Sequence, residues 1–210
     1  MSAPRIAVVD YGIGNLRSAE KALQHVDGDA ALTSDVRVIE RADAVVLPGV
    51  GAFGACMHAL RASGLEAVTK AAATDGRPFL GICIGMQMLF DGSDETPAVA
   101  GLGVVPGRVT LLPTTVRLPQ MGWNTISVAP GSQLAAYLPD PAWLYFVHSY
   151  APEPDDDGVV AAWCDYGRRF AAAIERGPVW ATQFHPEKSG DTGMRMLANF
   201  VEAVARPARV

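Results

Sequence analysis

Short apolar runs alternate with longer amphipathic segments through the first half of the chain. Residues 6–10 and 44–47 are apolar runs that predict buried strands. Residues 15–26 carry apolar side chains at helical spacing, and residues 52–63 and 65–73 also have helical patterns. Strands that alternate with helices are typical of βαβ units around a mostly parallel sheet. The sequence therefore predicts a doubly wound beginning.

The pattern changes in the second half. Residues 79–82 predict another buried strand, which leads into a helix from about residue 84. Beyond residue 108, short strands separated by Pro and Gly are predicted at 109–112, 125–128, 143–147, 159–163, 170–174 and 179–184. We expect these strands to be mixed or antiparallel, and a last amphipathic helix at 192–205 to pack against the sheet. With no internal repeat or linker, residues 1–210 are expected to form one α/β domain with a mostly parallel sheet, flanking helices and additional antiparallel strands.

Composition narrows the class of protein. Half of the 210 residues are hydrophobic, which is enough for a sizeable core and excludes a disordered chain. With 17 Lys and Arg against 22 Asp and Glu, the net charge of −5 argues against nucleic-acid and membrane-surface binding. We find no signal-peptide pattern and no apolar stretch near the length of about 18 residues that a membrane span needs. The three cysteines lie far apart without a C-x-x-C pair, so we expect no disulfide framework and no metal site. We expect a soluble protein of the reducing cytoplasm.

The G-x-C-x-G sequence around Cys83 is the most informative stretch. A buried strand runs into it and an apolar helix follows, as in a nucleophile elbow, where small neighbours such as Gly81 and Gly85 are required. At a helix N-terminus the thiolate of Cys83 would be favoured, and the N–H of Ile84 could bind an oxyanion. The alternative is a buried structural cysteine beside glycines that allow tight packing.

A cysteine nucleophile needs a base, and His185 is the candidate. It follows a predicted strand, in the sequence H-P-E, where Pro186 favours an extended conformation of His185. In an extended chain, side chains two residues apart point the same way, so Glu187 could orient the His185 ring. The alternative is a surface turn. H-x-E also occurs in zinc deaminases, but no P-C-x-x-C follows here.

A second glycine cluster, Gly49, Gly51 and Gly54, matches G-x-G-x-x-G and raises a dinucleotide site as an alternative. About 20 residues further on, where an acidic ribose partner is expected, the chain has Thr69 and Lys70. A loop whose N–H groups face Cys83 as oxyanion donors suits these glycines better.

Taken together, P-G-V-G at 48–51, G-I-C-I-G-M-Q at 81–87 and H-P-E at 185–187 resemble the class I glutamine amidotransferases, and the order and spacing match over the whole chain. The resemblance implies their three-layer α/β fold. Within that superfamily, D-Y-G-I-G-N-L at 10–16, M-G-W-N at 121–124 and F-V-H-S-Y at 146–150 are similar to the glutaminase subunits of imidazole glycerol phosphate synthase, from histidine biosynthesis. One departure is Gln120, where the family usually has His.

The resemblance implies roles for individual residues. Cys83 would attack the side-chain amide of L-glutamine, His185 would act as general base and acid, and Glu187 would orient it, with no cofactor. The implied oxyanion donors are the backbone N–H groups of Gly49, Val50, Gly51 and Ile84. The implied substrate-binding residues are Gly51, Gln87, Ser149 and Tyr150. For Gln87, a helix cap or a packing contact stays open as the alternative.

The family passes its ammonia to a separate cyclase with a (β/α)8 barrel, and the two subunits form a heterodimer. The chain carries no P-loop and no basic phosphate cluster, which fits an acceptor site on another subunit. Asn15, Trp123 and either Tyr145 or Tyr150 are candidates for the partner-facing surface, although the tyrosines could equally be core residues. His148 is expected to be structural.

Two other functions stay open: a glutaminase subunit for a different acceptor, and a binding or regulatory module in which Cys83 senses redox state. The complete set of Cys83, His185 and Glu187 favours an enzyme over the binding module.

Overall fold

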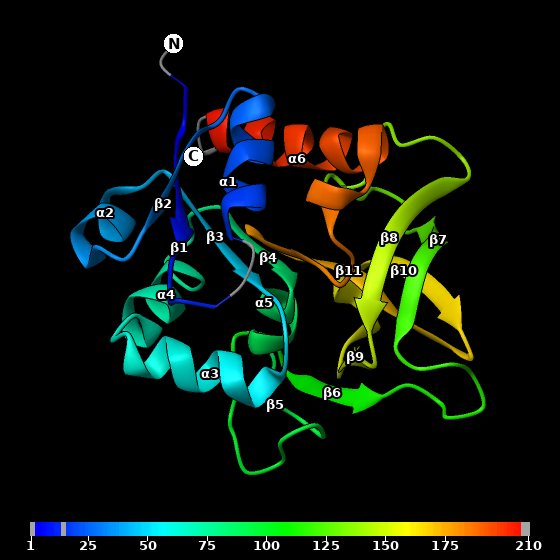
Figure 1. Ribbon diagram of the computed structural model, residues 1–210. Coiled ribbons are helices and arrows are strands. Elements are labelled where there is room, and N and C mark those ends of the chain that lie inside the picture. The colour runs from blue at the N-terminus through cyan, green and yellow to red at the C-terminus, as the bar shows by residue number, and fades with distance from the viewer. Residues whose placement is uncertain (1–2, 14–15, 207–210) are drawn as a thin grey trace.

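The structure is a computed structural model that describes residues 3–13 and 16–206 (Figure 1). Among these residues, nine strands form one large sheet. In spatial order they are β2 (Asp29–Thr33), β1 (Arg5–Val9), β3 (Ala44–Gly49), β4 (Phe79–Cys83), β12 (Val179–Thr182), β11 (Arg168–Arg176), β10 (Val160–Tyr166), β7 (Gln120–Val128) and β8 (Ala142–His148). The neighbouring pairs from β2 to β12 are parallel, and those from β12 to β8 are antiparallel. The predicted doubly wound beginning and the predicted antiparallel strands are thus both confirmed.

Helices cover both faces of this sheet (Figure 1). Helices α1 (Leu16–His25) and α6 (Gly190–Ala205) lie together on one face, and α3 (Phe53–Ala62), α4 (Glu66–Ala72) and α5 (Ile84–Met88) lie on the other. Helix α2 (Val36–Arg41) packs against α4. No helix in the described part of the chain is both long and apolar enough to span a membrane.

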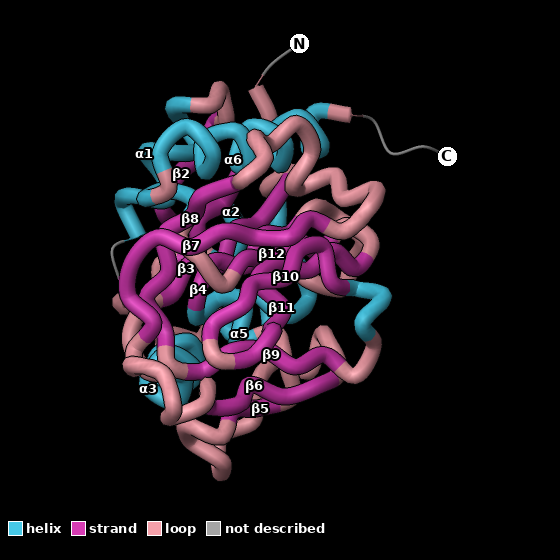
Figure 2. Tube along the Cα trace, turned by 90° about the vertical axis from the view of Figure 1, so that its right-hand side faces the viewer, coloured by secondary structure: helices cyan, strands magenta, loops and turns pink. Residues whose placement is uncertain are grey.

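A small second sheet lies beside the antiparallel part of the large one (Figure 2). Its strands, in spatial order, are β5 (Gly92–Ser93), β6 (Gly107–Leu111) and β9 (Tyr150–Pro154). Two short 3₁₀ helices complete the fold, η1 (Asp157–Val159) and η2 (Pro186–Lys188). Strands β8 and β9 are separated by a single residue, Ser149, so the chain passes directly from the large sheet into the small one. This change of sheet brings Ser149 and Tyr150 to the boundary between the two sheets.

The apolar stripe predicted for the first helix is the buried face of α1. Leu16, Ala19, Ala22 and Leu23 are buried, because residues three and four apart share one face of a helix. The predicted C-terminal helix is confirmed as α6. Most predicted strands are present with ends that differ by one or two residues, but β7 begins five residues before the predicted strand and β10 ends three residues after its prediction.

Strands β2, β5 and β9 and helix α2 were not predicted. Strand β2 reads D-A-A-L-T and buries Ala30 alone, so it has neither an apolar run nor a clear alternation. Side chains of α1 hold its outer edge: Glu20 accepts a hydrogen bond from the Leu32 N–H at 2.8 Å, and Gln24 donates one to the Ala30 carbonyl at 2.7 Å. Tertiary contacts of this kind leave no periodic signal in the strand itself.

Candidate active site

Cys83 occupies a strained turn between β4 and α5. Its φ of 55° and ψ of −111° are uncommon for any residue other than glycine. A side chain on Gly85 would overlap the carbonyl oxygen of Leu47, and a Cβ on Gly81 would lie 2.9 Å from the Gly85 carbonyl oxygen. Two tight backbone contacts therefore require the two glycines, as expected for a nucleophile elbow.

Helix α5 begins at Ile84, as predicted, and has five residues. Cys83 is its N-cap residue, so the predicted position of the thiol at a helix N-terminus is confirmed. The N–H of Ile84, the first residue after Cys83, is the local donor that this turn provides.

His185 and Glu187 are in contact. The Nδ1 atom of His185 lies 2.8 Å from a carboxylate oxygen of Glu187, and both side chains are almost fully buried. His185 is extended, as Pro186 predicts, but the chain then turns into η2. The contact thus crosses a 3₁₀ turn, and the prediction that both side chains project from one extended segment is wrong.

Ser189 fixes the backbone of this segment to β8. Its hydroxyl donates to the His185 carbonyl at 2.6 Å and accepts from the Tyr145 N–H at 3.0 Å. In addition, the His185 N–H donates to the Tyr145 carbonyl at 3.0 Å. Ser189 was not singled out from the sequence, and Tyr145 was considered only for the partner-facing surface, because this contact joins residues 44 positions apart.

The two buried histidines near the site have opposite pKa shifts. Burial by itself lowers the pKa of His185, but the Cys83 thiol and the Glu187 carboxylate outweigh it and raise that pKa to about 9. Burial lowers the pKa of His148 to about 4, against a hydrogen bond at 2.9 Å to the Tyr150 carbonyl. At neutral pH, His185 can therefore hold a proton beside Cys83, whereas His148 is neutral and supports the Tyr150 backbone.

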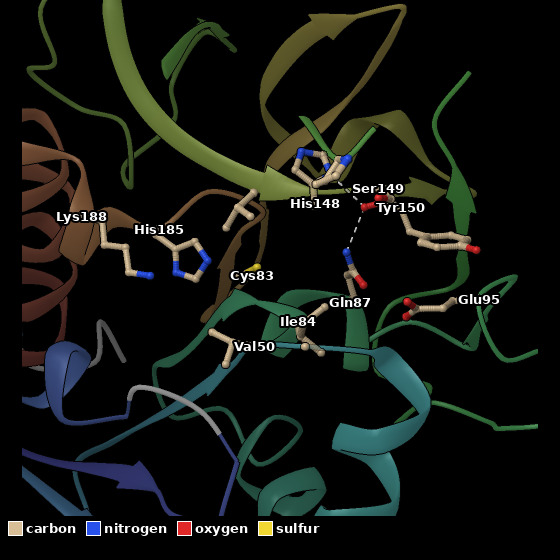
Figure 3. Close-up of a pocket in the computed structure, with 13 residues that line it drawn as sticks. Val50, Cys83, Ile84, Gln87, Glu95, His148, Ser149, Tyr150, His185 and Lys188 are labelled. Carbon is tan, nitrogen blue, oxygen red and sulfur yellow. Dashed lines mark hydrogen bonds between the residues drawn. The ribbon is translucent and has the colours of Figure 1, made fainter. Parts of the chain in front are cut away.

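A cavity of about 430 Å³ lies above Cys83 (Figure 3). It brings together all of the catalytic, oxyanion and substrate residues expected at the site except Gly49 and Glu187: Val50, Gly51, Cys83, Ile84, Gln87, Ser149, Tyr150 and His185. Glu187 lies behind His185, and Gly49 packs directly against Ile84 on a smaller adjoining cavity. Of the glycine cluster, Gly51 thus lines the Cys83 cavity and Gly49 lies beside it, which favours the oxyanion-donor interpretation over a dinucleotide site.

Gln87 connects the cavity wall to Cys83 through a second glutamine. Its side-chain amide donates to the Tyr150 carbonyl at 3.0 Å and to the Gln183 side-chain oxygen at 2.9 Å. Gln183 in turn points its amide nitrogen at the Cys83 sulfur, 3.8 Å away. Gln183 was missed from the sequence, although it stands two residues before His185 in the same segment.

Five further residues line the cavity without having been assigned to it from the sequence. They are Glu95, Pro119, Val147, His148 and Lys188. Glu95 accepts a hydrogen bond from the Phe53 N–H at 2.7 Å, which ties the cavity wall to the start of α3. Lys188 directly follows H-P-E and could have been suspected, whereas Glu95 lies in a loop without any local signal.

The partner-facing candidates have different positions. Trp123 is 54% exposed on β7 and makes an edge-to-face contact with Tyr145, which is half-buried on β8. Tyr150 is half-buried on the cavity wall. Asn15 lies outside the described residues. Gln120, the departure from the family pattern, is buried at the start of β7.

Comparison with known proteins identifies the family. The model of the family described as glutamine amidotransferase class-I matches residues 7–204. The imidazole glycerol phosphate synthase subunit HisH of Methanothermobacter thermautotrophicus is 50% identical, over 95% of this chain and 98% of its own. HisH of Symbiobacterium thermophilum is 47% identical, over 93% and 92% of the two chains.

Solved structures agree on the fold. PurLQS from Thermotoga maritima has a TM-score of 0.76 at 20% identity, covering 96% of this chain and 99% of the other. A glutamine amidotransferase from the same organism has a TM-score of 0.70 at 14% identity, covering 99% of this chain and 100% of the other. The chain therefore belongs to the class I glutamine amidotransferases and, within them, to the family of imidazole glycerol phosphate synthase subunits HisH.

Proposed function

We propose that this protein hydrolyses L-glutamine to glutamate and ammonia through Cys83, His185 and Glu187, with residues 1–210 acting as one glutaminase domain. The observation that carries the proposal is the arrangement around the cavity. A cysteine in a strained turn lies beside a histidine whose other ring nitrogen is bonded to a buried carboxylate. A purely structural cysteine has no need of either neighbour.

The reaction follows from these positions. The Cys83 sulfur attacks the side-chain amide carbon of glutamine, and the N–H groups of Ile84 and of the loop at 48–51 stabilise the oxygen anion. His185 gives its proton to the departing nitrogen, which leaves as ammonia. A γ-glutamyl thioester remains on Cys83. His185 then takes a proton from water, which attacks the thioester and releases glutamate with the Cys83 thiol restored. Glu187 holds the ring of His185 and stabilises its charged form.

The far end of the cavity suits an amino acid. Glu95 supplies a carboxylate there, which would pair with the α-ammonium group of glutamine. Gly51, Gln87 and the backbone of Ser149 and Tyr150 line the same wall and would hold the rest of the substrate. With the Glu95 carboxylate at one end and Cys83 at the other, the cavity would select a substrate with the length of glutamine.

An exposed apolar strip beside the cavity suits a partner subunit. Met121, Trp123 and Trp143 are 50–66% exposed, and Tyr145 and Val147 lie on the same face of the β7–β8 pair. Val147 also lines the cavity. Exposed aromatic residues are enriched at interfaces. We propose that this strip contacts a (β/α)8-barrel cyclase in a heterodimer that receives the ammonia and makes imidazole glycerol phosphate and aminoimidazole carboxamide ribonucleotide.

The state of the cysteines supports a cytoplasmic location. All three cysteines are free and buried in the structure, which fits the reducing cytoplasm, where histidine biosynthesis would take place.

Replacement of Cys83 tests the mechanism. Cys83→Ala should abolish glutamate release while leaving folding and complex formation intact, because the side chain is small and lies at the cavity wall. Cys164→Ala is the matched control, since it makes the same change in a buried cysteine away from the cavity. Glutamate release by Cys83→Ala at the parent rate would rule out the mechanism.

A second experiment tests which synthase receives the ammonia. We expect glutamine hydrolysis to rise strongly when the cyclase and its nucleotide ligand are both present. Stimulation by another synthase instead would assign the same glutaminase chemistry to a different pathway.

A further inference from the structure

Two buried side chains that the reaction does not use hold the loop that faces the nucleophile. The Tyr11 hydroxyl donates a hydrogen bond to the Pro48 carbonyl at 2.8 Å, and the Cys56 thiol donates one to the Val50 carbonyl at 3.3 Å. Tyr11 is 4% exposed and Cys56 is fully buried. The two groups come from opposite sides of the loop in sequence, one from the segment after β1 and the other from α3.

Both groups are suited to act as donors. Burial raises the pKa of the Tyr11 hydroxyl and of the Cys56 thiol, so each keeps the hydrogen that it donates. The two hydrogen bonds together support residues 48–51.

The support determines where the N–H groups of the loop point. In a planar trans peptide the C=O and N–H bonds point in opposite directions. Because the Val50 carbonyl is bonded to Cys56, the N–H of Gly51 must point away from Cys56. Gly51 lines the cavity and Cys56 does not, which fits a Gly51 N–H that faces the substrate.

The same hydroxyl also limits the position of the loop. A Cβ on Gly49 would lie 2.9 Å from the Tyr11 hydroxyl and 3.0 Å from the Gly85 nitrogen. The loop thus packs closely between Tyr11 and the turn that carries Cys83. The Tyr11 hydroxyl therefore limits how far the loop can move away from that turn.

We propose that Tyr11 and Cys56 are positioning residues that hold the Pro48 and Val50 carbonyls and so aim the Gly51 N–H at the oxygen anion formed on glutamine. The proposal rests on the glutaminase function above. Without these two hydrogen bonds, the Val50 peptide could rotate and turn its carbonyl oxygen toward the developing anion, which it would repel.

The test compares two reactions of Cys83, both measured in the complex with the cyclase and its ligand. Glutamine hydrolysis forms an oxygen anion, whereas alkylation by iodoacetamide displaces iodide and forms none. Tyr11→Phe and Cys56→Ala should each lower kcat about tenfold with KM changed less than about twofold, because the support acts mainly in the transition state. The rate of Cys83 alkylation, followed by peptide mapping, should not change.

Two further variants separate positioning from general damage. Cys56→Ser keeps a donor at the same place and should retain most of the parent kcat. Cys164→Ala removes a buried thiol elsewhere and should have the parent kcat.

The proposal fails if kcat for Tyr11→Phe and Cys56→Ala stays within about twofold of the parent value. It also fails if alkylation falls in parallel with kcat, which would indicate damage to the nucleophile, or if KM alone rises, which would make the Gly51 N–H a substrate-binding group. None of these outcomes affects the proposed function, which depends on the Cys83→Ala result.

Discussion

The proposed nucleophile, Cys83, and the proposed base, His185, are positioned in different ways. Cys83 is placed by its immediate neighbours, since Gly81 and Gly85 permit the strained turn at the end of a buried parallel strand. His185 lies at the start of a turn after β12, and its backbone is held by Tyr145 of β8 and by Ser189. One side of the site is thus specified locally by backbone sterics, and the other by hydrogen bonds to a distant antiparallel strand.

This difference predicts different responses to substitution. Backbone overlap cannot be relieved by rotating a side chain, so changes on the nucleophile side should affect folding itself. Hydrogen bonds on the base side can be removed one at a time, so changes there should affect activity before they affect the fold.

The largest effect is expected from Gly85→Ala. The added methyl group would overlap the Leu47 carbonyl oxygen of the adjacent strand, so β3 and α5 would have to separate. We expect a loss of about 3 kcal/mol or more in the free energy of unfolding, measured with denaturant. Gly92→Ala is the control, since its Cβ would meet the end of the flexible Arg108 side chain at 3.2 Å and should cost less than about 1 kcal/mol. Equal losses in both variants would contradict the account of the turn.

The next largest effect is expected from Glu187→Gln, on activity. The amide keeps the shape of the side chain but removes the charge that stabilises protonated His185, so kcat should fall on the order of 10²- to 10⁴-fold. Glu153→Gln changes an exposed ion pair with Arg168 and should leave kcat unaltered. Parent-like activity of Glu187→Gln would remove Glu187 from the mechanism.

The same variant has a pH signature in stability. The folded-state pKa of His185 is raised from 6.5 to about 9, so the folded protein binds the extra proton more tightly than the unfolded chain. This stabilisation is complete below about pH 6.5 and is lost as the pH rises to about 9. The difference in unfolding free energy between parent and Glu187→Gln should therefore shrink over that interval. A difference that grows with pH would show that the sign of the shift is wrong.

The same contrast explains what could be predicted from the sequence. The turn at Cys83 and most buried strands were predictable, because glycine requirements and apolar runs are local signals. His185 and Glu187 were also predictable as a pair, although the 3₁₀ turn that joins them was not.

What was missed depends on distant contacts. Gln183, Ser189 and Glu95 are polar residues in ordinary positions, and each acquires its role from a partner brought close by the fold. Strand β2 was missed for the same reason, since α1 holds its edge. The proposed reacting groups are thus easier to identify from the sequence than the groups that orient them.

The smallest of these effects is expected from Ser189→Ala. The change removes the hydroxyl between the His185 carbonyl and the Tyr145 N–H but does not touch the imidazole ring or Glu187. We expect kcat to fall roughly tenfold through slight misplacement of the ring, with a loss of about 1–2 kcal/mol in unfolding free energy. Because the pKa of His185 is set by Cys83 and Glu187, the pH profile of kcat/KM should keep its shape, unlike that of Glu187→Gln. Ser63→Ala, which removes a hydroxyl at the end of α3, is the control and should leave kcat unchanged. If Ser189→Ala instead shifted the pH profile, the backbone support and the charge of the base would be one coupled unit, and the separation of their roles would be wrong.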